Sequence, residues 1–152
     1  MKTNKTARLD LSGKEMQDFG YKVVDAVVAH FETQDQKLPV ANATRKEMDQ
    51  LFSEEVPENS MPANDVLKFV LENVMTQSNV MTHPKSYAFV PGPSNFISVM
   101  SDTLATGFNI FAGGWVGSAA AAGIEIITLN WLLKLFNFPV KKGGGIFTSG
   151  GS

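Results

Sequence analysis

The residues best suited to a chemical role lie in the glycine-rich stretch 143–152, Gly-Gly-Gly-Ile-Phe-Thr-Ser-Gly-Gly-Ser. Small residues let backbone N–H groups converge, and hydroxyl groups add donors, so such a turn before a helix suits a phosphate. The dinucleotide-binding pattern fails because Thr148 stands where its third glycine belongs, and no Gly-Lys-Ser/Thr follows. A nucleophile elbow also fails, because Phe147 stands two residues before Ser149. The stretch predicts a short strand, residues 145–148, and half of a phosphate turn; a flexible tail or cloning remnant is the alternative.

Other candidates for acid–base or metal chemistry are scattered along the chain. His30 is interpreted as a structural or surface residue of a helix, and His83 precedes Pro84 in a loop. No metal site is predicted, because the sequence has no cysteine and neither histidine has a second one nearby. Glu125 and Asp102 are interpreted as structural carboxylates. The charge of Glu125 would interact favourably with the dipole at the N-terminal end of its helix. General acid–base catalysis needs a partner that is not evident, so no catalytic residue is predicted.

Two rigid loops carry aromatic residues and proline. Phe89 and Pro91 lie in the first loop, and Phe111 and Trp115 lie in or beside the second. Such residues belong either to a core or to the wall of a ligand pocket, because binding residues often lie on loops that a scaffold holds. The residues alone leave both interpretations open.

Five helices are expected to position these loops. Each has apolar residues at helical spacing, and residue pairs typical of capping boxes open the first two. The predicted helices cover residues 14–33, 45–52 and 62–75, then a helix through Ile97 and Phe108, and residues 119–136. The first three have too few residues for a core of their own. They form either a small bundle or an arm that packs on a larger domain or a second subunit.

The overall composition is that of a globular protein. The chain has 152 residues, 43% hydrophobic and 18% charged, which suits one domain or a large piece of one. A net charge of −2 gives no reason to expect nucleic acid or an anionic membrane as a partner. The first residues lack the apolar segment of a signal peptide, so we expect a cytoplasmic protein. Residues 119–140 are the most apolar segment, but Glu125 and Lys134 disfavour a membrane-spanning helix.

The second half of the chain carries a family resemblance in the order and spacing of its residues. These are His83-Pro84, Phe89-Val90-Pro91-Gly92-Pro93-Ser94, Asp102, Trp115, Ser118, Glu125, Trp131-Leu132, Phe138-Pro139 and the stretch 143–152. The ensemble resembles the group II pyridoxal-phosphate-dependent decarboxylases, which include the aromatic-L-amino-acid, tyrosine, histidine and glutamate decarboxylases. The first helices are similar to the N-terminal segment of that family, more loosely.

The resemblance implies a type I, aminotransferase-like fold, of which this piece is mainly α. Residues 1–82 would be a helical arm that clasps the partner subunit of a homodimer. Residues 83–152 would begin the large α/β domain that binds pyridoxal 5′-phosphate, cut off at the phosphate turn. The chain would then be the N-terminal fragment of an amino-acid decarboxylase, a carboxy-lyase, with an aromatic amino acid as substrate. A non-catalytic helical dimerisation module is the alternative.

The resemblance also implies roles for individual residues. The cofactor phosphate would be held by Gly151 and Ser152, with Gly150 just before them. The substrate pocket would be lined by Phe89, Val90, Pro91 and Gly92, and reached from the other subunit by Phe111 and Gly113. Gly113 departs from the larger residue often found at its position. The family's cofactor-binding lysine lies beyond Ser152, and no lysine of this chain has a matching context, so the piece alone is predicted to be inactive and a C-terminal part to complete it.

Overall fold

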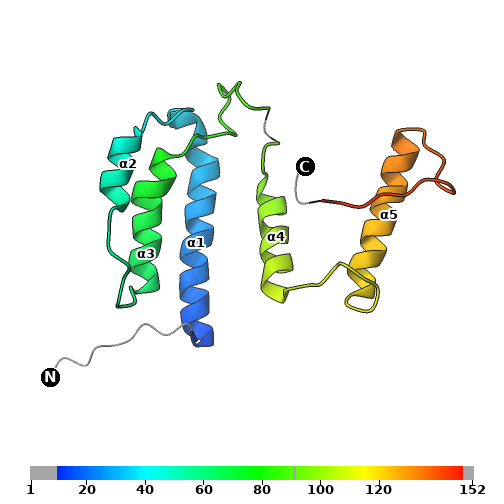
Figure 1. The fold of residues 1–152 in the computed structure, drawn as a ribbon, viewed down its shortest axis with the longest axis horizontal. Helices are drawn as coiled ribbons and strands as arrows, with labels where there is room; N and C mark the ends of the chain where they lie inside the picture. The colour runs from blue at the N-terminus through cyan, green and yellow to red at the C-terminus, as the bar shows by residue number, and fades with distance from the viewer. Residues whose placement is uncertain (1–9, 91, 149–152) are drawn as a thin grey trace. The chain divides into compact units, whose positions relative to one another are not determined.

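The protein is described by a computed structural model that covers residues 10–90 and 92–148 (Figure 1). The chain divides into two compact units, Met1–Phe96 and Ile97–Ser152. The described residues form α-helices, short turns of 3₁₀- and π-helix and connecting segments, with no β-strand among them. The prediction of a mainly helical piece is therefore confirmed. The predicted arm, residues 1–82, falls within the first unit, and the boundary at residue 83 stays a prediction.

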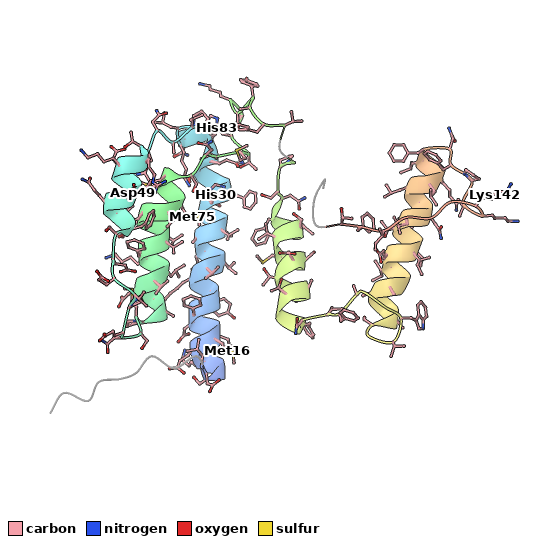
Figure 2. The ribbon with its side chains drawn as sticks, in the orientation of Figure 1. Met16, His30, Asp49, Met75, His83 and Lys142 are labelled. Carbon is pink, nitrogen blue, oxygen red and sulfur yellow. The ribbon has the colours of Figure 1, made fainter. Side chains whose placement is uncertain are left out.

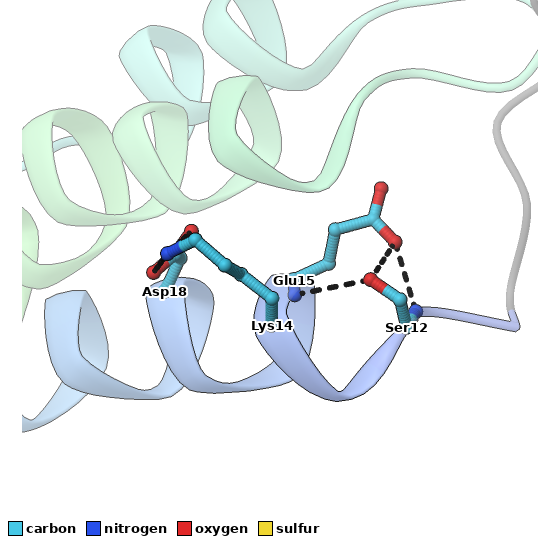
Figure 3. A network of polar contacts seen from close by, with 4 residues as sticks. All are labelled: Ser12, Lys14, Glu15 and Asp18. Atoms are coloured by element: carbon cyan, nitrogen blue, oxygen red, sulfur yellow. Dashed lines mark hydrogen bonds and ion pairs between the residues drawn. The ribbon is translucent and has the colours of Figure 1, made fainter.

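Helix α1, Gly13–Thr33, begins at a complete capping box (Figure 3). Ser12 Oγ accepts the backbone N–H of Glu15 at 3.3 Å, and Glu15 Oε2 accepts the backbone N–H of Ser12 at 2.8 Å. One turn on, Lys14 pairs with Asp18 at 3.0 Å. Such a cap stabilises a helix by about 1 kcal/mol, because it satisfies N–H groups that the first turn leaves without partners. The predicted helix start is confirmed.

The next two helices differ in how closely they follow the prediction. Helix α2, Arg45–Phe52, has the expected capping box between Thr44 and Glu47. Helix α3, Ala63–Phe69, ends sooner than the predicted residue 75 and continues as the π-helix η2, Val70–Val74, and the 3₁₀-helix η3, Met75–Gln77. Asn73 Nδ2 donates to the carbonyl of Phe69 at 3.0 Å. A side chain that bonds the backbone four residues earlier competes with regular helix, which is consistent with the change of winding.

Within the first unit, α3 is linked to both of its neighbours (Figure 1). Lys22 Nζ of α1 donates to Asn64 Oδ1 of α3 at 2.8 Å. The rings of Phe52 in α2 and Phe69 in α3 meet edge to face with centroids 6.1 Å apart. Only Val80 and His83 are buried among the described residues of this unit. Helix α3 thus contacts both α1 and α2, and much of the apolar surface of the three helices stays exposed.

The second unit contains α5, Ala119–Leu135, and all of α4, Phe96–Phe108, except its first residue. Ser118 caps α5, its hydroxyl accepting the backbone N–H of Ala121 at 3.3 Å. Helix α5 is apolar on all sides, as helices buried on several faces are. In the part of the chain that the structure describes, no helix is both long and apolar enough to span a bilayer.

Candidate functional site

The predicted phosphate residues, Gly150, Gly151 and Ser152, lie outside the described residues. The chain that leads to them, residues 143–148, is described and forms neither a helix nor a strand. The strand predicted at residues 145–148 was therefore wrong for this chain. A strand needs a neighbouring strand for its ladder of hydrogen bonds, and the described residues contain none.

This segment instead lies against helix α5, where three contacts hold it. Glu125 Oε1 accepts the backbone N–H of Phe147 at 3.0 Å. A Cβ atom added to Gly145 would lie 3.0 Å from Leu129 Cδ2, and one added to Gly143 would lie 3.1 Å from Leu133 Cδ2. A side chain at either position would therefore crowd a leucine of α5, and at Gly143 also the Pro139 carbonyl, 3.2 Å from the added Cβ. We call residues 143–148 the tail segment.

The tail segment gives Glu125 a role that the sequence did not reveal. Glu125, Leu129 and Leu133 recur at four-residue spacing and so share one face of α5. All three are half-buried, whereas Ile124, Ile127 and Trp131 on the opposite face are exposed. The apolar residues at helical spacing on the other side of α5 are mostly exposed, with only Leu132 half-buried; they are Ile124, Ile127, Trp131, Leu132 and Leu135. Because α5 is apolar all round, periodicity does not distinguish its two faces.

The predicted substrate loop is described apart from Pro91, which lies outside the described residues. Phe89 and Val90 are 81% and 98% exposed, and no atom lies within 4 Å of a Cβ built on Gly92. Phe89 and Val90 have φ angles of 64° and 47°, in the left-handed region. That region is costly for a β-branched residue such as Val90, and the residue before a proline normally prefers an extended conformation. The loop backbone is therefore strained, at a typical cost of about 1–3 kcal/mol per residue.

A turn around His83 precedes that loop. His83 is 6% exposed, and its Nδ1 accepts the backbone N–H of Lys85 at 2.9 Å. Its own N–H donates to the carbonyl of Val80 at 3.0 Å, and its carbonyl accepts from Ser86 at 2.8 Å. Figure 2 shows His83 in the connection that follows the helices of the first unit. His83 therefore holds a turn, a role for which its position before Pro84 gave no signal.

The second predicted pocket pair, Phe111 and Gly113, lies in a loop of the second unit. A Cβ on Gly113 would lie 2.8 Å from Phe111 Cζ, so the Phe111 ring occupies the space beside Gly113. The structure thus brings these two residues together, whereas Phe89, Val90 and Gly92 belong to the first unit. The assignment of all of them to one pocket stays a prediction.

The remaining polar candidates do not gather into a reactive group. Lys37 Nζ lies 3.4 Å from His30 Nδ1, and Asp102 is exposed on α4. Partial burial and then the Lys37 ammonium lower the pKa of His30. Over residues 10–90 and 92–148, no three His, Asp or Glu side chains group as metal ligands. A surface hollow of about 390 Å³ lies along α2 and contains none of the predicted site residues. It is lined by Arg45, Met48, Asp49, Phe52 and Ser53.

Comparison with known proteins identifies the chain. A family model described as the pyridoxal-dependent decarboxylase conserved domain matches residues 45–152. An aromatic-L-amino-acid decarboxylase of Bacillus atrophaeus is 39% identical over 145 residues, which cover 95% of this chain and 30% of that protein. Tyrosine decarboxylase 2 of Narcissus pseudonarcissus is 22% identical, over 90% of this chain and 28% of that protein. The chain therefore spans about 30% of the length of these curated relatives.

Solved structures show the same fold. Tryptophan decarboxylase of Catharanthus roseus, in complex with L-tryptophan, matches with a TM-score of 0.77 at 20% identity, over 87% of this chain and 28% of that one. A TDC structure from Oryza sativa with PLP and tryptamine matches with a TM-score of 0.77 at 20% identity, over 88% and 28%. The described residues thus have the fold of a part of these proteins, which agrees with the predicted type I fold.

Proposed function

Because the chain belongs to the pyridoxal-dependent decarboxylase family, we propose that it is the N-terminal part of an amino-acid decarboxylase with an aromatic substrate. The observation that carries the proposal is the family match over residues 45–152 together with 39% identity to an aromatic-L-amino-acid decarboxylase. Relatives that are named for tyrosine or tryptophan support an aromatic side chain.

The tail segment, residues 143–148, leads directly to the residues proposed to hold the cofactor phosphate, which lie outside the described residues. Gly143 and Gly145 keep the tail segment close to α5, and Glu125 holds Phe147 three residues before Gly150. Pyridoxal phosphate, when bound, supplies the electron sink for loss of the α-carboxylate. The chain's own contribution would be to hold the phosphate through Gly150, Gly151 and Ser152.

The substrate and assembly assignments follow from the same proposal. The substrate loop is strained and exposes the side chains of Phe89 and Val90, and the space beside Gly92 is open. Such features are expected of residues that contact a ligand or a partner subunit. The exposed apolar surface of α1 to α3 suits a homodimer in which these helices clasp a second copy. We also propose a cytoplasmic location for the protein.

The experiment joins this chain to the C-terminal segment of the Bacillus atrophaeus relative and measures release of carbon dioxide from tyrosine, tryptophan, histidine and glutamate. Decarboxylation of an aromatic amino acid that depends on added pyridoxal phosphate is the expected result. Preference for histidine or glutamate would contradict the substrate assignment. A folded hybrid that binds no pyridoxal phosphate would contradict the proposal as a whole.

A helical dimerisation module without catalysis is the competing function. It is favoured by the exposed Trp131, Ile124 and Ile127 on one face of α5, a surface typical of association. Light scattering of the 152-residue chain distinguishes the two when it is combined with the hybrid enzyme. A stable dimer whose hybrid shows no activity would favour the module.

A further inference from the structure

The predicted substrate loop, residues 84–95, leaves the first unit and returns to it. Ser86 is half-buried, residues 87–90 and 92–95 are all exposed, and Phe96 is half-buried again. Both ends of the loop belong to the first unit, because that unit extends to Phe96. The exposed part of the loop is therefore bounded on each side by a residue that is packed into the same unit.

A different kind of contact holds each end of the loop. At the first end, the buried His83 accepts the backbone N–H of Lys85 through Nδ1 and that of Ser86 through its carbonyl. At the second end, the rings of Phe31 and Phe96 meet edge to face, with centroids 6.4 Å apart and planes at 85°. Phe31 lies in the last turn of α1 and is itself half-buried. Helix α1 thus supplies the contact that fixes the far end of the loop.

The strain within the loop requires restraint from outside it. Phe89 and Val90 both have φ angles in the left-handed region, and such a conformation persists only where the surrounding structure imposes it. The side chains of both residues are exposed, so their own contacts restrain them little. Fixing both ends of a loop reduces the range of conformations that its residues can adopt. The contacts at the two ends are therefore well placed to impose the strained conformation.

We propose that Phe31 is a positioning residue for the substrate loop: it holds the ring of Phe96 and thereby keeps Phe89 and Val90 in the conformation that meets the substrate side chain. The proposal rests on the proposed function for what the loop binds. Phe31 touches neither the substrate nor the cofactor in this account, and its effect passes through Phe96 and the loop backbone. Helix α1, predicted only as part of a dimer-clasping arm, would then also affect how the substrate binds.

The first test measures the backbone chemical shifts of Phe89 and Val90 by NMR in the 152-residue chain, since these shifts distinguish left-handed from extended backbone. Phe31→Ala should lower the ratio of left-handed to extended conformers about tenfold, because the edge-to-face contact is lost. Phe31→Tyr keeps the ring and should keep the ratio. Phe52→Ala is the matched control, because it removes the edge-to-face contact with Phe69 in the same unit, and it should leave the ratio unchanged. Equal ratios in Phe31→Ala and the original chain would overturn the proposal.

A second pair of variants covers the case in which Phe31→Ala does not fold. Phe96→Ala removes the same contact from the side of the loop, and Phe31→Leu keeps apolar volume in α1 without the ring. Circular dichroism shows which variants keep the helix content of the original chain. A folded Phe96→Ala or Phe31→Leu should show the same loss of left-handed conformers. Original shifts at Phe89 and Val90 in folded Phe96→Ala would contradict the role of the ring contact.

The second test measures KM and kcat of the hybrid enzyme described above, with L-tyrosine and L-tryptophan as substrates. Phe31→Ala should raise KM about fivefold and change kcat and the affinity for pyridoxal phosphate by less than about twofold, because the loop contacts the substrate side chain and not the reacting atoms. Phe31→Tyr should restore KM, and Phe52→Ala should not change it.

The outcomes separate this proposal from the proposed function. An unchanged KM in Phe31→Ala, or an equal rise in Phe31→Ala and Phe52→Ala, would show that Phe31 does not position the loop for the substrate. If the unsubstituted hybrid decarboxylates no amino acid, the proposed function fails. The chemical shifts of Phe89 and Val90 would still decide whether Phe31 holds the loop.

Discussion

The ring of Phe111 fills the space that a side chain at Gly117 would need. A Cβ on Gly117 would clash with Phe111 Cδ1 and lie 3.1 Å from the Phe111 carbonyl oxygen. Gly113 lies beside the same ring, because a Cβ added to it would be 2.8 Å from Phe111 Cζ. The loop between α4 and α5 therefore folds around one aromatic ring. Gly113 and Gly117 follow Phe111 by two and six residues, and this spacing alone does not predict that both would lie against its ring.

We expect Gly117→Ala to disturb this loop, at a cost of about 1–3 kcal/mol, because overpacking forces the ring or the backbone to move. Gly114→Ala is the matched control, since nothing lies within 4 Å of its Cβ. Fluorescence of Trp115, in a Trp131→Phe background, reports on the loop during urea unfolding. Phe111→Ala should relieve much of the Gly117→Ala effect in a double-mutant cycle. Equal effects of alanine at 114 and 117 would rule out the ring contact.

The histidine of α1 should titrate below the usual range. Partial burial and then Lys37 lower the pKa of His30, and the ammonium lies 3.4 Å from Nδ1. The neutral form is favoured in the folded chain, so its contribution to stability is present above the unfolded pKa of about 6.5 and is lost as pH falls through the folded pKa. An NMR titration checks the pKa, and urea unfolding at several pH values checks the stability.

Lys37→Gln should raise the pKa of His30 only part of the way, because burial is the larger cause. Lys14→Gln, near the other end of the 21-residue helix, should leave this pKa unchanged, since that separation exceeds the Debye length of about 8–10 Å. Figure 2 labels His30 towards one end of α1 and Met16 towards the other. A full return to the ordinary value in Lys37→Gln would contradict the dominance of burial.

The cap of α2 should be sensitive to acid. Glu47 Oε2 accepts the backbone N–H and the hydroxyl of Thr44, each at 2.7 Å, and these bonds lower the pKa of Glu47, the backbone bond most. The stabilising effect is present above the unfolded pKa of about 4.3 and is lost as pH falls through the folded value. Thr44→Val, which removes the hydroxyl, should raise the pKa of Glu47 in an NMR titration. Thr44→Ser should preserve it, and an unchanged pKa in the valine variant would contradict the side-chain bond.

Pyridoxal phosphate should label no single lysine of the 152-residue chain. The family's cofactor-binding lysine is expected beyond Ser152, so only scattered surface amines are available. Incubation at a one-to-one ratio, borohydride reduction and peptide mapping should give weak labelling spread over several lysines. Stoichiometric labelling of one lysine would show that the chain carries its own cofactor amine. Bovine serum albumin treated in parallel controls for surface reactivity.

Local features of the fold were predicted from the sequence, and contacts across longer separations were not. The capping boxes at Ser12 and Thr44 involve residues three apart, so residue type and spacing suffice to predict them. The pairing of Glu125 with Phe147 spans 22 residues and depends on which face of α5, a helix with apolar residues on every side, the tail segment meets. No periodicity encodes that choice.

The glycines of the tail segment show why the site was only partly predicted. Gly143 and Gly145 were interpreted through phosphate binding, whereas their described contacts are with Leu133 and Leu129. Glycine serves both backbone convergence and close packing, so its presence alone does not separate the two uses. Similarly, a strand at residues 145–148 could not be judged without knowing whether a partner strand is available.

The 22-residue separation of Glu125 and Phe147 also sets a delay during protein synthesis. A ribosome adds about 5–20 residues per second, so Phe147 follows Glu125 by about 1–4 s. During that interval the face of α5 that carries Leu129 and Leu133 has been synthesised, but the tail segment that covers it has not. The caps of α1 and α2, in contrast, are complete within three residues. Leu129 and Leu133 therefore form an apolar surface that a chaperone would meet on the nascent chain. The tail segment covers this surface only after residues 143–147 have emerged.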